Sequence, residues 1–184
     1  VSQRRSSRIA GSGSRCHLGG MERPPFDLAV VGAGLNGSLL AVAAAAAGLE
    51  TALIDRMPLS ALAEAGFDGR TTAVAYTSQR LFAALGLWDE LVPHAEPIRD
   101  IRISDAGHDG RASPLFLHFD HREAADEGSE PAPMGWIVEN RFLRAALLRR
   151  LETSPRVELI SPDEVTDTER TLDRATLALK SGRR

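Results

Sequence analysis

Residues 26–56 read FDLAVVGAGLNGSLLAVAAAAAGLETALIDR, and the order of residue types in them predicts the first elements of the fold. Its first six residues are almost wholly apolar, which is typical of a strand buried on both faces of a parallel sheet. After a glycine-rich turn, residues 38–47 are rich in alanine and leucine and predict a helix that Gly48 ends. Residues 51–54 have the pattern of a second strand. Together these elements fit one βαβ unit, so the sequence predicts an α/β fold with a central parallel sheet.

The turn has the spacing Gly-x-Gly-x-x-Gly, and each glycine has its own task. Gly32 permits the tight turn out of the strand, Gly34 lets the backbone approach a pyrophosphate, and Gly37 lets helix and strand pack closely. The helix start that contains Leu35 and Asn36 offers free backbone N–H groups and a partial positive charge. Phosphates can therefore bind there without lysine or arginine.

Asp55 stands at the end of the second predicted strand, 23 residues after Gly32. A carboxylate there can accept hydrogen bonds from an adenosine ribose, and it disfavours a 2′-phosphate. The structural alternative is a glycine turn between packed elements. The strand before the turn, the helix after it and the acid beyond it together favour a Rossmann-like dinucleotide site. The spacing alone does not choose FAD over NAD.

Two further helices are predicted beyond the βαβ unit. The first has its signal from Ser78, ends at Gly86, and is expected to present one apolar face made of Leu81 and Leu85, with Phe82 beside them. The second can be capped by Asn140 and ends before Pro155. Its leucines repeat every four residues along one face, at Leu143, Leu147 and Leu151.

An antiparallel hairpin is predicted between these helices. Ile101 and Ile103 alternate with polar neighbours, and residues 115–119 form a second strand candidate across a glycine turn. Residues 120–133 are acidic and contain proline, so an exposed loop is expected there. Further strand candidates lie at residues 136–138, 157–160 and 177–179.

Bulk properties narrow the class of protein. With 184 residues and 43% hydrophobic content, the chain can bury one sizeable core. The net charge of −3 does not suggest the basic stripe of a nucleic-acid-binding domain, so no nucleic-acid partner is expected. Residues 39–48, the longest apolar stretch, fall well short of the roughly 18 to 20 residues that span a bilayer. Cys16 is the single cysteine, which fits a reducing cytoplasm.

Residues 1–20 differ in composition from the rest of the chain. They contain four arginines, several serines and no acidic residue, which is the composition of a mitochondrial presequence. Glycine and serine at residues 11–14 would interrupt an amphipathic targeting helix, however. We therefore expect a disordered leader over residues 1–20, with Met21 as the natural start, and one domain over residues 21–184.

Three later blocks follow the opening stretch in the order found in one enzyme family. They are FDGRTTAVAYTSQRLFAALGLWDEL at residues 67–91, IRISDAG at 101–107 and GWIVENRFLRAALLRRL at 135–151. In combination the four blocks resemble the ubiquinone-biosynthesis hydroxylases, which are FAD monooxygenases of the p-hydroxybenzoate hydroxylase type. The resemblance covers nearly all of residues 26–151, and it implies that the dinucleotide is FAD.

The resemblance also implies which residues approach the cofactor. Arg70 would approach the FAD ribose or phosphates, with a surface ion pair to Asp68 as the alternative. The block at residues 139–141, with Arg144, matches a segment that runs along the flavin; the alternative makes Asn140 a helix cap and the arginines a solvated face. No catalytic residue is assigned. The candidate cofactor-binding residues are Gly32, Gly34, Leu35, Asn36, Gly37, Asp55, Arg56, Arg70 and Arg141.

Two other groups of residues are assigned to structure rather than chemistry. His118 and His121 flank Asp120, but no cysteine or further histidine cluster completes a metal site, so we expect a solvated rim and no metal. Trp88 and Trp136 are expected to pack in the core.

For the full-length enzyme the resemblance implies hydroxylation of the aromatic ring of a polyprenylated phenol or benzoquinol, with FAD reduced by NAD(P)H and dioxygen as co-substrate. Peripheral association with the inner membrane and membership of a ubiquinone-biosynthesis complex are implied as well. Family members carry further glycine motifs and a sheet domain around the substrate, so we expect residues 21–184 to form a truncated FAD-binding domain, inactive in isolation. Two alternatives stay open: an FAD-dependent hydroxylase of a soluble phenol, and a non-catalytic FAD-binding fragment.

Overall fold

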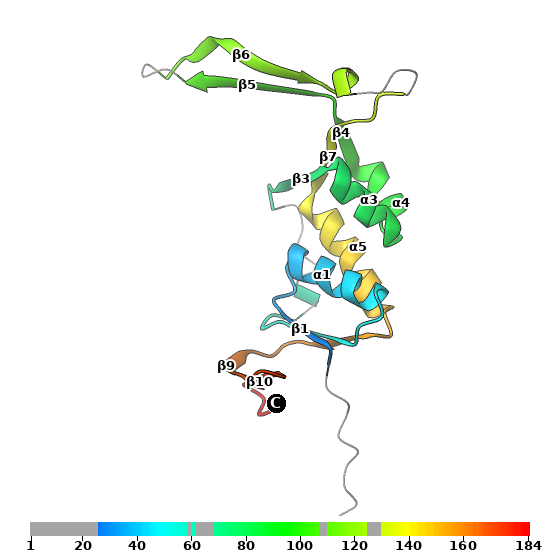
Figure 1. The fold of residues 1–184 in the computed structure, drawn as a ribbon, viewed down its shortest axis with the longest axis vertical. Coiled ribbons are helices and arrows are strands. Elements are labelled where there is room, and N and C mark those ends of the chain that lie inside the picture. Colours follow the sequence, from blue (N-terminus) through cyan, green and yellow to red (C-terminus); the bar gives the residue numbers. More distant parts are fainter. Residues whose placement is uncertain (1–25, 59, 62–67, 107–109, 125–129) are drawn as a thin grey trace, which may run out of the picture.

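The computed structural model describes residues 26–58, 60–61, 68–106, 110–124 and 130–184 (Figure 1). The leader expected at residues 1–20 lies outside the described residues. So do parts of two other predicted features, namely residues 107–109 of the hairpin turn and residues 125–129 of the acidic loop.

Three parallel strands form the sheet next to the glycine turn. β1 (Leu28–Val31) pairs with β2 (Thr51–Ile54), and β2 pairs with β8 (Val157–Ile160), in the order β1-β2-β8. Helix α1 (Leu35–Ala46) connects β1 to β2, and helix α5 (Asn140–Glu152) precedes β8 and packs against α1. The predicted α/β fold with a parallel sheet is confirmed. The helix starts three residues earlier than expected, because it begins inside the glycine turn.

Burial differs between the strands of this sheet. β2 is buried along its whole length, as expected for a central parallel strand. In β1, Leu28 and Val30 face the core formed with α1 and α5, whereas Val31 is 60% exposed. The prediction that β1 is buried on both faces is therefore wrong. β1 is an edge strand, and the described residues leave its second face open.

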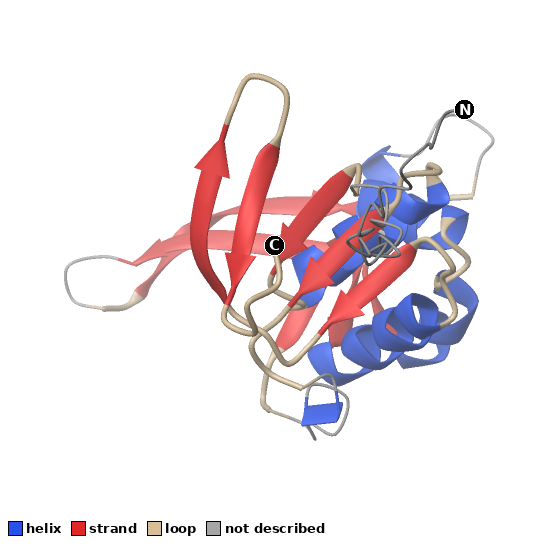
Figure 2. Cartoon of the chain, turned by 90° about the horizontal axis from the view of Figure 1, so that it is seen from below, coloured by secondary structure: helices blue, strands red, loops and turns tan. Residues whose placement is uncertain are grey.

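The core lies between the sheet and the two long helices. Ala41 and Val42 of α1 are buried with Leu143, Leu147 and Leu151 of α5, and all five side chains are at most 2% exposed. Small residues on α1 let the leucine-rich face of α5 approach closely. Each leucine removed from water contributes roughly 2 kcal/mol, so this contact stabilises the position of the glycine turn. Figure 2 shows the helices gathered on one side of the strands.

A second, antiparallel sheet lies next to the start of α5. Its order is β3 (Thr71–Ala75), β7 (Gly135–Glu139) and β4 (Ala95–Ile98), with β7 in the middle. β7 confirms the strand predicted at residues 136–138, whereas β3 and β4 were not predicted. The connection between them contains α3 (Tyr76–Ala84), α4 (Trp88–Leu91) and the 3-10 turn η1 (Val92–His94).

The apolar face predicted for helix α3 is partly wrong. Phe82 and Leu85 are buried, but Leu81 is 41% exposed. Leu85 already caps the helix, which ends at Ala84, so the four-residue spacing from Leu81 does not continue on one face. The helix rests on its sheet through Phe82 and leaves Leu81 towards solvent. Gly86 has φ +71° and stops the helix as predicted.

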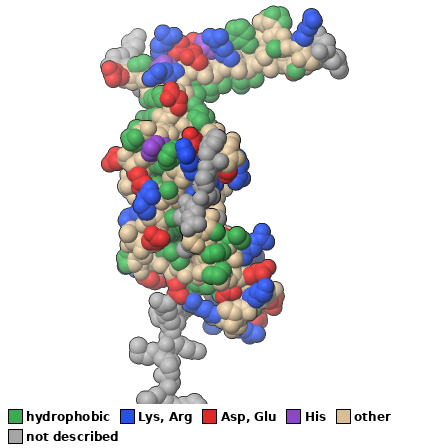
Figure 3. All heavy atoms as spheres, turned by 180° about the vertical axis from the view of Figure 1, so that it is seen from behind, with side chains coloured by type: hydrophobic (Ala, Val, Ile, Leu, Met, Phe, Trp, Pro, Cys, Tyr) green, Lys and Arg blue, Asp and Glu red, His purple; other side chains and the backbone are tan. Residues whose placement is uncertain are grey.

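The predicted hairpin is present and extends away from the body of the molecule (Figure 1). β5 (Asp100–Ala106) pairs antiparallel with β6 (Ala112–Asp120), which is followed by the 3-10 turn η2 (His121–Ala124). The register places Ile101 opposite Phe119 and Ile103 opposite Leu117, and all four side chains are at least 37% exposed. Apolar side chains are accordingly visible along the hairpin in Figure 3.

A two-stranded antiparallel sheet follows β8. β9 (Val165–Arg170) pairs with β10 (Ala175–Leu179), which contains the strand predicted at residues 177–179. β9 was not predicted, because its sequence VTDTER is largely polar and has no apolar alternation. Among the described residues, no helix has the length and apolarity required to cross a membrane.

Candidate dinucleotide-binding site

The glycine turn joins β1 to α1 at very short range. Gly32 has φ +101°, which L side chains rarely adopt, and its N–H donates to the carbonyl of Ile54 at 2.7 Å. A Cβ on Gly37 would lie 1.9 Å from the carbonyl oxygen of Gly32. The helix thus passes so close to the turn that glycine alone fits at position 37. This geometry agrees with the two roles assigned to these glycines from the sequence.

Gly34 presents a different geometry. It has φ −67° and ψ −178°, which any residue can adopt, and an added Cβ would meet no atom within 4 Å. Nothing inside the described protein therefore requires glycine here. The open space lies directly before the first turn of α1, where a closely approaching ligand would need it.

The start of α1 is suited to an anion. Its first helical hydrogen bond runs from the N–H of Ser38 to the carbonyl of Gly34 at 2.9 Å, so the N–H groups of Leu35, Asn36 and Gly37 have no helical acceptor. The N-cap residue makes no side-chain hydrogen bond to them, and no acidic residue occupies the first turn. The partial positive charge of the helix end is consequently left for a ligand such as a phosphate.

Asp55 lies beside the glycine turn, as predicted from its position after β2. Its Oδ2 accepts a hydrogen bond from the N–H of Ala33 at 2.6 Å, and its Oδ1 accepts one from Met57 at 2.7 Å. Each carboxylate oxygen has a second lone pair, which can accept a ribose hydroxyl. Arg56 follows and is exposed at the same edge.

Ser38 is a contributor that the sequence interpretation missed. Its hydroxyl is buried and donates to the carbonyl of Ala33 at 3.0 Å. This bond holds the peptide between Ala33 and Gly34, while the N–H of Ala33, in the preceding peptide, donates to Asp55. A serine directly after the third glycine, on the buried side of the helix, was the available signal.

Arg70 lies in an ion pair with Asp68. Its Nε and Nη2 donate to Asp68 Oδ2 at 3.0 and 2.8 Å, and its side chain is 71% exposed. These bonds are the largest cause that lowers the pKa of Asp68 to about 2. The ion-pair alternative is thus what the structure shows. An approach of Arg70 to FAD stays a prediction.

Asn140 does not cap α5. The N-cap is Glu139, and Asn140 is the first helical residue. Its Oδ1 accepts a hydrogen bond from the Thr72 hydroxyl at 2.6 Å, and its N–H donates to the carbonyl of Arg70 at 3.1 Å. The capping prediction is wrong because β7 runs directly into α5. The first residue of the helix therefore meets the neighbouring strand β3.

Arg141 is held at the same end of α5. Its Nε lies 2.7 Å from Glu139 Oε2, and its guanidinium carbon lies 4.6 Å from the centroid of the Phe142 ring. His94 stacks on the same ring at 3.7 Å between centroids. The side chain is 43% exposed, so Arg141 is oriented without being buried.

The structure assembles these predicted residues in two groups. The glycine turn and Asp55 are joined directly by hydrogen bonds, since they follow neighbouring parallel strands at one sheet edge. Arg70 is joined to the start of α5, which contains Arg141. Figure 1 shows the first turn of α1 beside α5 and below β3. Contact between α1 and α5 brings the two groups into one region of the fold.

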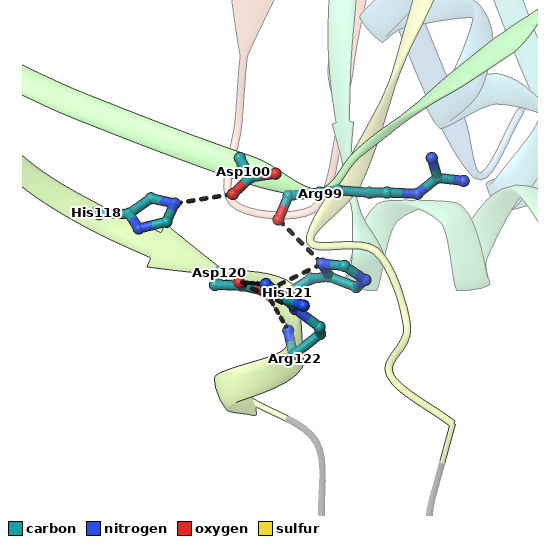
Figure 4. A network of polar contacts seen from close by, with 6 residues as sticks. All are labelled: Arg99, Asp100, His118, Asp120, His121 and Arg122. Atoms are coloured by element: carbon teal, nitrogen blue, oxygen red, sulfur yellow. Dashed lines mark hydrogen bonds and ion pairs between the residues drawn. The ribbon is translucent and has the colours of Figure 1, made fainter.

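His118 and His121 lie elsewhere, at the base of the hairpin (Figure 4). His118 Nε2 is 2.8 Å from Asp100 Oδ1, and His121 Nδ1 is 3.4 Å from Asp120 Oδ1. A hydrogen bond from Arg122 is the main cause that lowers the pKa of Asp120. Within the described parts of the chain, no three histidine, cysteine or acidic side chains group as metal ligands. Polar pairing accounts for this network.

The two tryptophans pack against each other. Their ring centroids are 5.0 Å apart in an edge-to-face arrangement, and Trp88 is 9% exposed. Tyr76 stacks on Trp136 at 6.3 Å. The predicted packing role is confirmed for both rings.

Comparison with known proteins identifies the family of the chain. The sequence pattern of the FAD binding domain family matches residues 26–183. The ubiquinone hydroxylase UbiL of Rhodospirillum rubrum is 43% identical over 156 residues, which are 85% of this chain and 34% of that protein. The 3-demethoxyubiquinol 3-hydroxylase of Escherichia coli K12 is 30% identical over 164 residues, covering 88% of this chain and 39% of that protein.

Solved structures share the fold at lower identity. The p-nitrophenol 4-monooxygenase PnpA of Pseudomonas putida DLL-E4 is 18% identical with a TM-score of 0.62, over 84% of this chain and 37% of that one. The anhydrotetracycline hydroxylase OxyS of Streptomyces rimosus is 21% identical with a TM-score of 0.61, over 85% and 29%. The chain spans between about a third and two fifths of the curated relatives described above. From its sequence and its fold, the chain belongs to the FAD binding domain family.

Proposed function

We propose that this chain is the FAD-binding part of a monooxygenase that hydroxylates the aromatic ring of a polyprenylated phenol or benzoquinol in ubiquinone biosynthesis. The names of the curated relatives support the substrate class. The observation that carries the cofactor is the geometry at Gly34, where open space meets an uncapped helix start. A dinucleotide pyrophosphate needs both a close backbone approach and free N–H donors.

Different described residues would bind different parts of FAD. The first turn of α1 would bind the pyrophosphate, and Asp55 would accept hydrogen bonds from the adenosine ribose. Arg70 would reach a ribose or phosphate oxygen, and Arg141 would lie along the flavin. When bound, FAD supplies the redox chemistry, with electrons from NAD(P)H and oxygen from O₂. The chain contributes binding and orientation, and no described side chain is assigned a proton-transfer step.

The remaining parts of the proposal concern the whole protein. A polyprenylated substrate partitions into a bilayer, which favours peripheral association with the inner membrane from the cytoplasmic side. Work on such a substrate also favours contact with other enzymes of ubiquinone biosynthesis. The relatives' names support the pathway, and the physical nature of the substrate supports the membrane.

The test is a fluorescence titration of the 184-residue chain with FAD, and with NAD for comparison. We expect saturable FAD binding and much weaker NAD binding. A chain that is folded by circular dichroism but binds neither dinucleotide would refute the cofactor assignment. For the whole protein, NAD(P)H oxidation should be stimulated more by a polyprenylated phenol than by the same phenol without its tail. Equal stimulation would refute the substrate class.

A further inference from the structure

Arg144 is a nearly buried arginine in the second turn of α5. Its side chain is 13% exposed, and its Nη1 donates to Asp68 Oδ2 at 3.2 Å. Its Nε and Nη2 are buried and have no hydrogen-bond partner among the described residues. These two nitrogens form the edge of the guanidinium that usually binds a carboxylate or phosphate with two parallel bonds.

Such an arrangement is unfavourable for stability. A buried polar group left without a partner destabilises the folded state, and here two donors are in that state. An apolar side chain of similar length would fill the same space without this cost. The stability of the fold therefore does not explain why arginine occupies position 144.

Arg144 cannot itself reach a ligand in this conformation, because protein atoms cover its free edge. Its Nη1 instead contacts the ion pair of Asp68 and Arg70, which leads from the interior to the surface. Asp68 is 27% exposed, and Arg70, which binds the same carboxylate oxygen with two nitrogens, is 71% exposed. The other oxygen of Asp68 accepts the N–H of Arg70 at 3.1 Å. Asp68 is thus held from both sides, by α5 and by its own turn.

We propose that Arg144 is a positioning residue for the cofactor: it holds Asp68, and Asp68 orients the exposed guanidinium of Arg70 towards a phosphate or ribose oxygen of the dinucleotide. This inference rests on the proposed FAD binding. It assigns to α5 a contribution that passes through a carboxylate 76 positions away in the chain. Arg70 is then directed before the ligand arrives, which reduces the entropy lost on binding.

The first test replaces Arg144 with methionine in the 184-residue chain. We expect the dissociation constant for FAD to rise about five- to tenfold, as when a preorganised charged donor is released. The thermal midpoint should stay the same or rise, because two unpartnered donors are removed. Arg144→Lys should recover part of the affinity, and Arg150→Met, at an exposed position of the same helix, should bind like the wild type. Unchanged FAD affinity in Arg144→Met would overturn the proposal.

A double-mutant cycle then separates positioning from an independent contact. If Arg144 acts through Arg70, Arg144→Met should weaken binding no further in an Arg70→Met background. Equal losses in both backgrounds would show that Arg144 acts by another route and would overturn the proposal.

The last readout needs no cofactor. Carbon-13 NMR follows the carboxyl of Asp68, whose pKa the Arg144 hydrogen bond helps to lower. In Arg144→Met this pKa should rise, and by less than in Arg70→Met. An unchanged value would overturn the contact on which the inference depends. If the wild-type chain bound no FAD, the proposed function would fail, and the NMR titration would still decide whether Arg144 holds Asp68.

Discussion

Gly37→Ala should mainly lower stability, whereas Gly34→Ala should mainly lower FAD affinity, although the two residues are only three positions apart. At Gly37 the new Cβ would lie 1.9 Å from a backbone oxygen, whereas ordinary contact begins at 3.4 Å. The turn and the helix would have to separate by about 1.5 Å, and neither atom belongs to a side chain that can rotate away. At Gly34 the Cβ would meet nothing, and the backbone is already in an allowed region.

These geometries set the magnitudes. Overpacking of this kind costs about 1–3 kcal/mol, and we expect the upper end because backbone atoms clash. Alanine recovers about 1 kcal/mol of helix propensity. Gly37→Ala should therefore lose about 2 kcal/mol, or roughly 5 °C in thermal midpoint. Gly34→Ala should lose less than about 1 kcal/mol as a weaker N-cap. Its methyl group fills the space of the pyrophosphate, so its FAD affinity should fall more than about tenfold.

The assay combines urea unfolding, followed by circular dichroism, with FAD titration of each variant under conditions where it is fully folded. Gly48→Ala is a useful comparison, since that glycine has φ +94° but lies at the far end of α1. It should lower stability without a direct effect on FAD binding. If Gly34→Ala bound FAD as tightly as the wild type, the open space would not be the pyrophosphate position. If Gly37→Ala were as stable as the wild type, the close-packing argument would be refuted.

Three further outcomes are expected. Asp55→Asn keeps one acceptor oxygen for the glycine turn, so it should lose about 1 kcal/mol of stability and about tenfold in FAD affinity; full affinity by titration would contradict the ribose role. The pKa of Asp68 is lowered from 3.8 to about 2, chiefly by Arg70, so the stability it contributes is present above about pH 4 and is lost as the pH falls towards 2. Asp68→Asn should accordingly show a shallower loss of thermal midpoint over that range, and an equally steep loss would contradict this. Leu147→Ala should lower the free energy of unfolding, measured with urea, by about 3 kcal/mol. Leu117→Ala on the hairpin, where the side chain is 63% exposed, should change it by less than about 0.5 kcal/mol. Similar losses in the two variants would refute the core described above.

Several parts of the fold and site could be predicted because their signals are local. The βαβ unit depends on the order of a strand, three glycines, a helix and an acid within residues 26–56. The close packing at Gly37 and the place of Asp55 follow from that order alone. The buried leucine face of α5 could also be predicted, because apolar residues that repeat with the helical period mark the side of a long helix that is covered.

Strands with weak patterns could not be predicted. β3, β4 and β9 are short or polar, and they form strands because a partner with matching register lies beside them. Leu81 shows the same limit for a helix. Its spacing from Leu85 suggested a shared face, but the helix ended before Leu85 and its contact with the sheet passed through Phe82.

Local sequence was enough to predict the fold class, the glycine turn and the position of Asp55, because these depend on neighbours within about thirty residues. Two contacts between distant segments emerged only on folding: Asn140 binds Thr72 across 68 positions, and Arg144 donates to Asp68 across 76. The physical reason is that periodicity specifies which side of an element is apolar. It does not specify which distant element packs there, and that packing determines the partner, burial and pKa of each charged side chain.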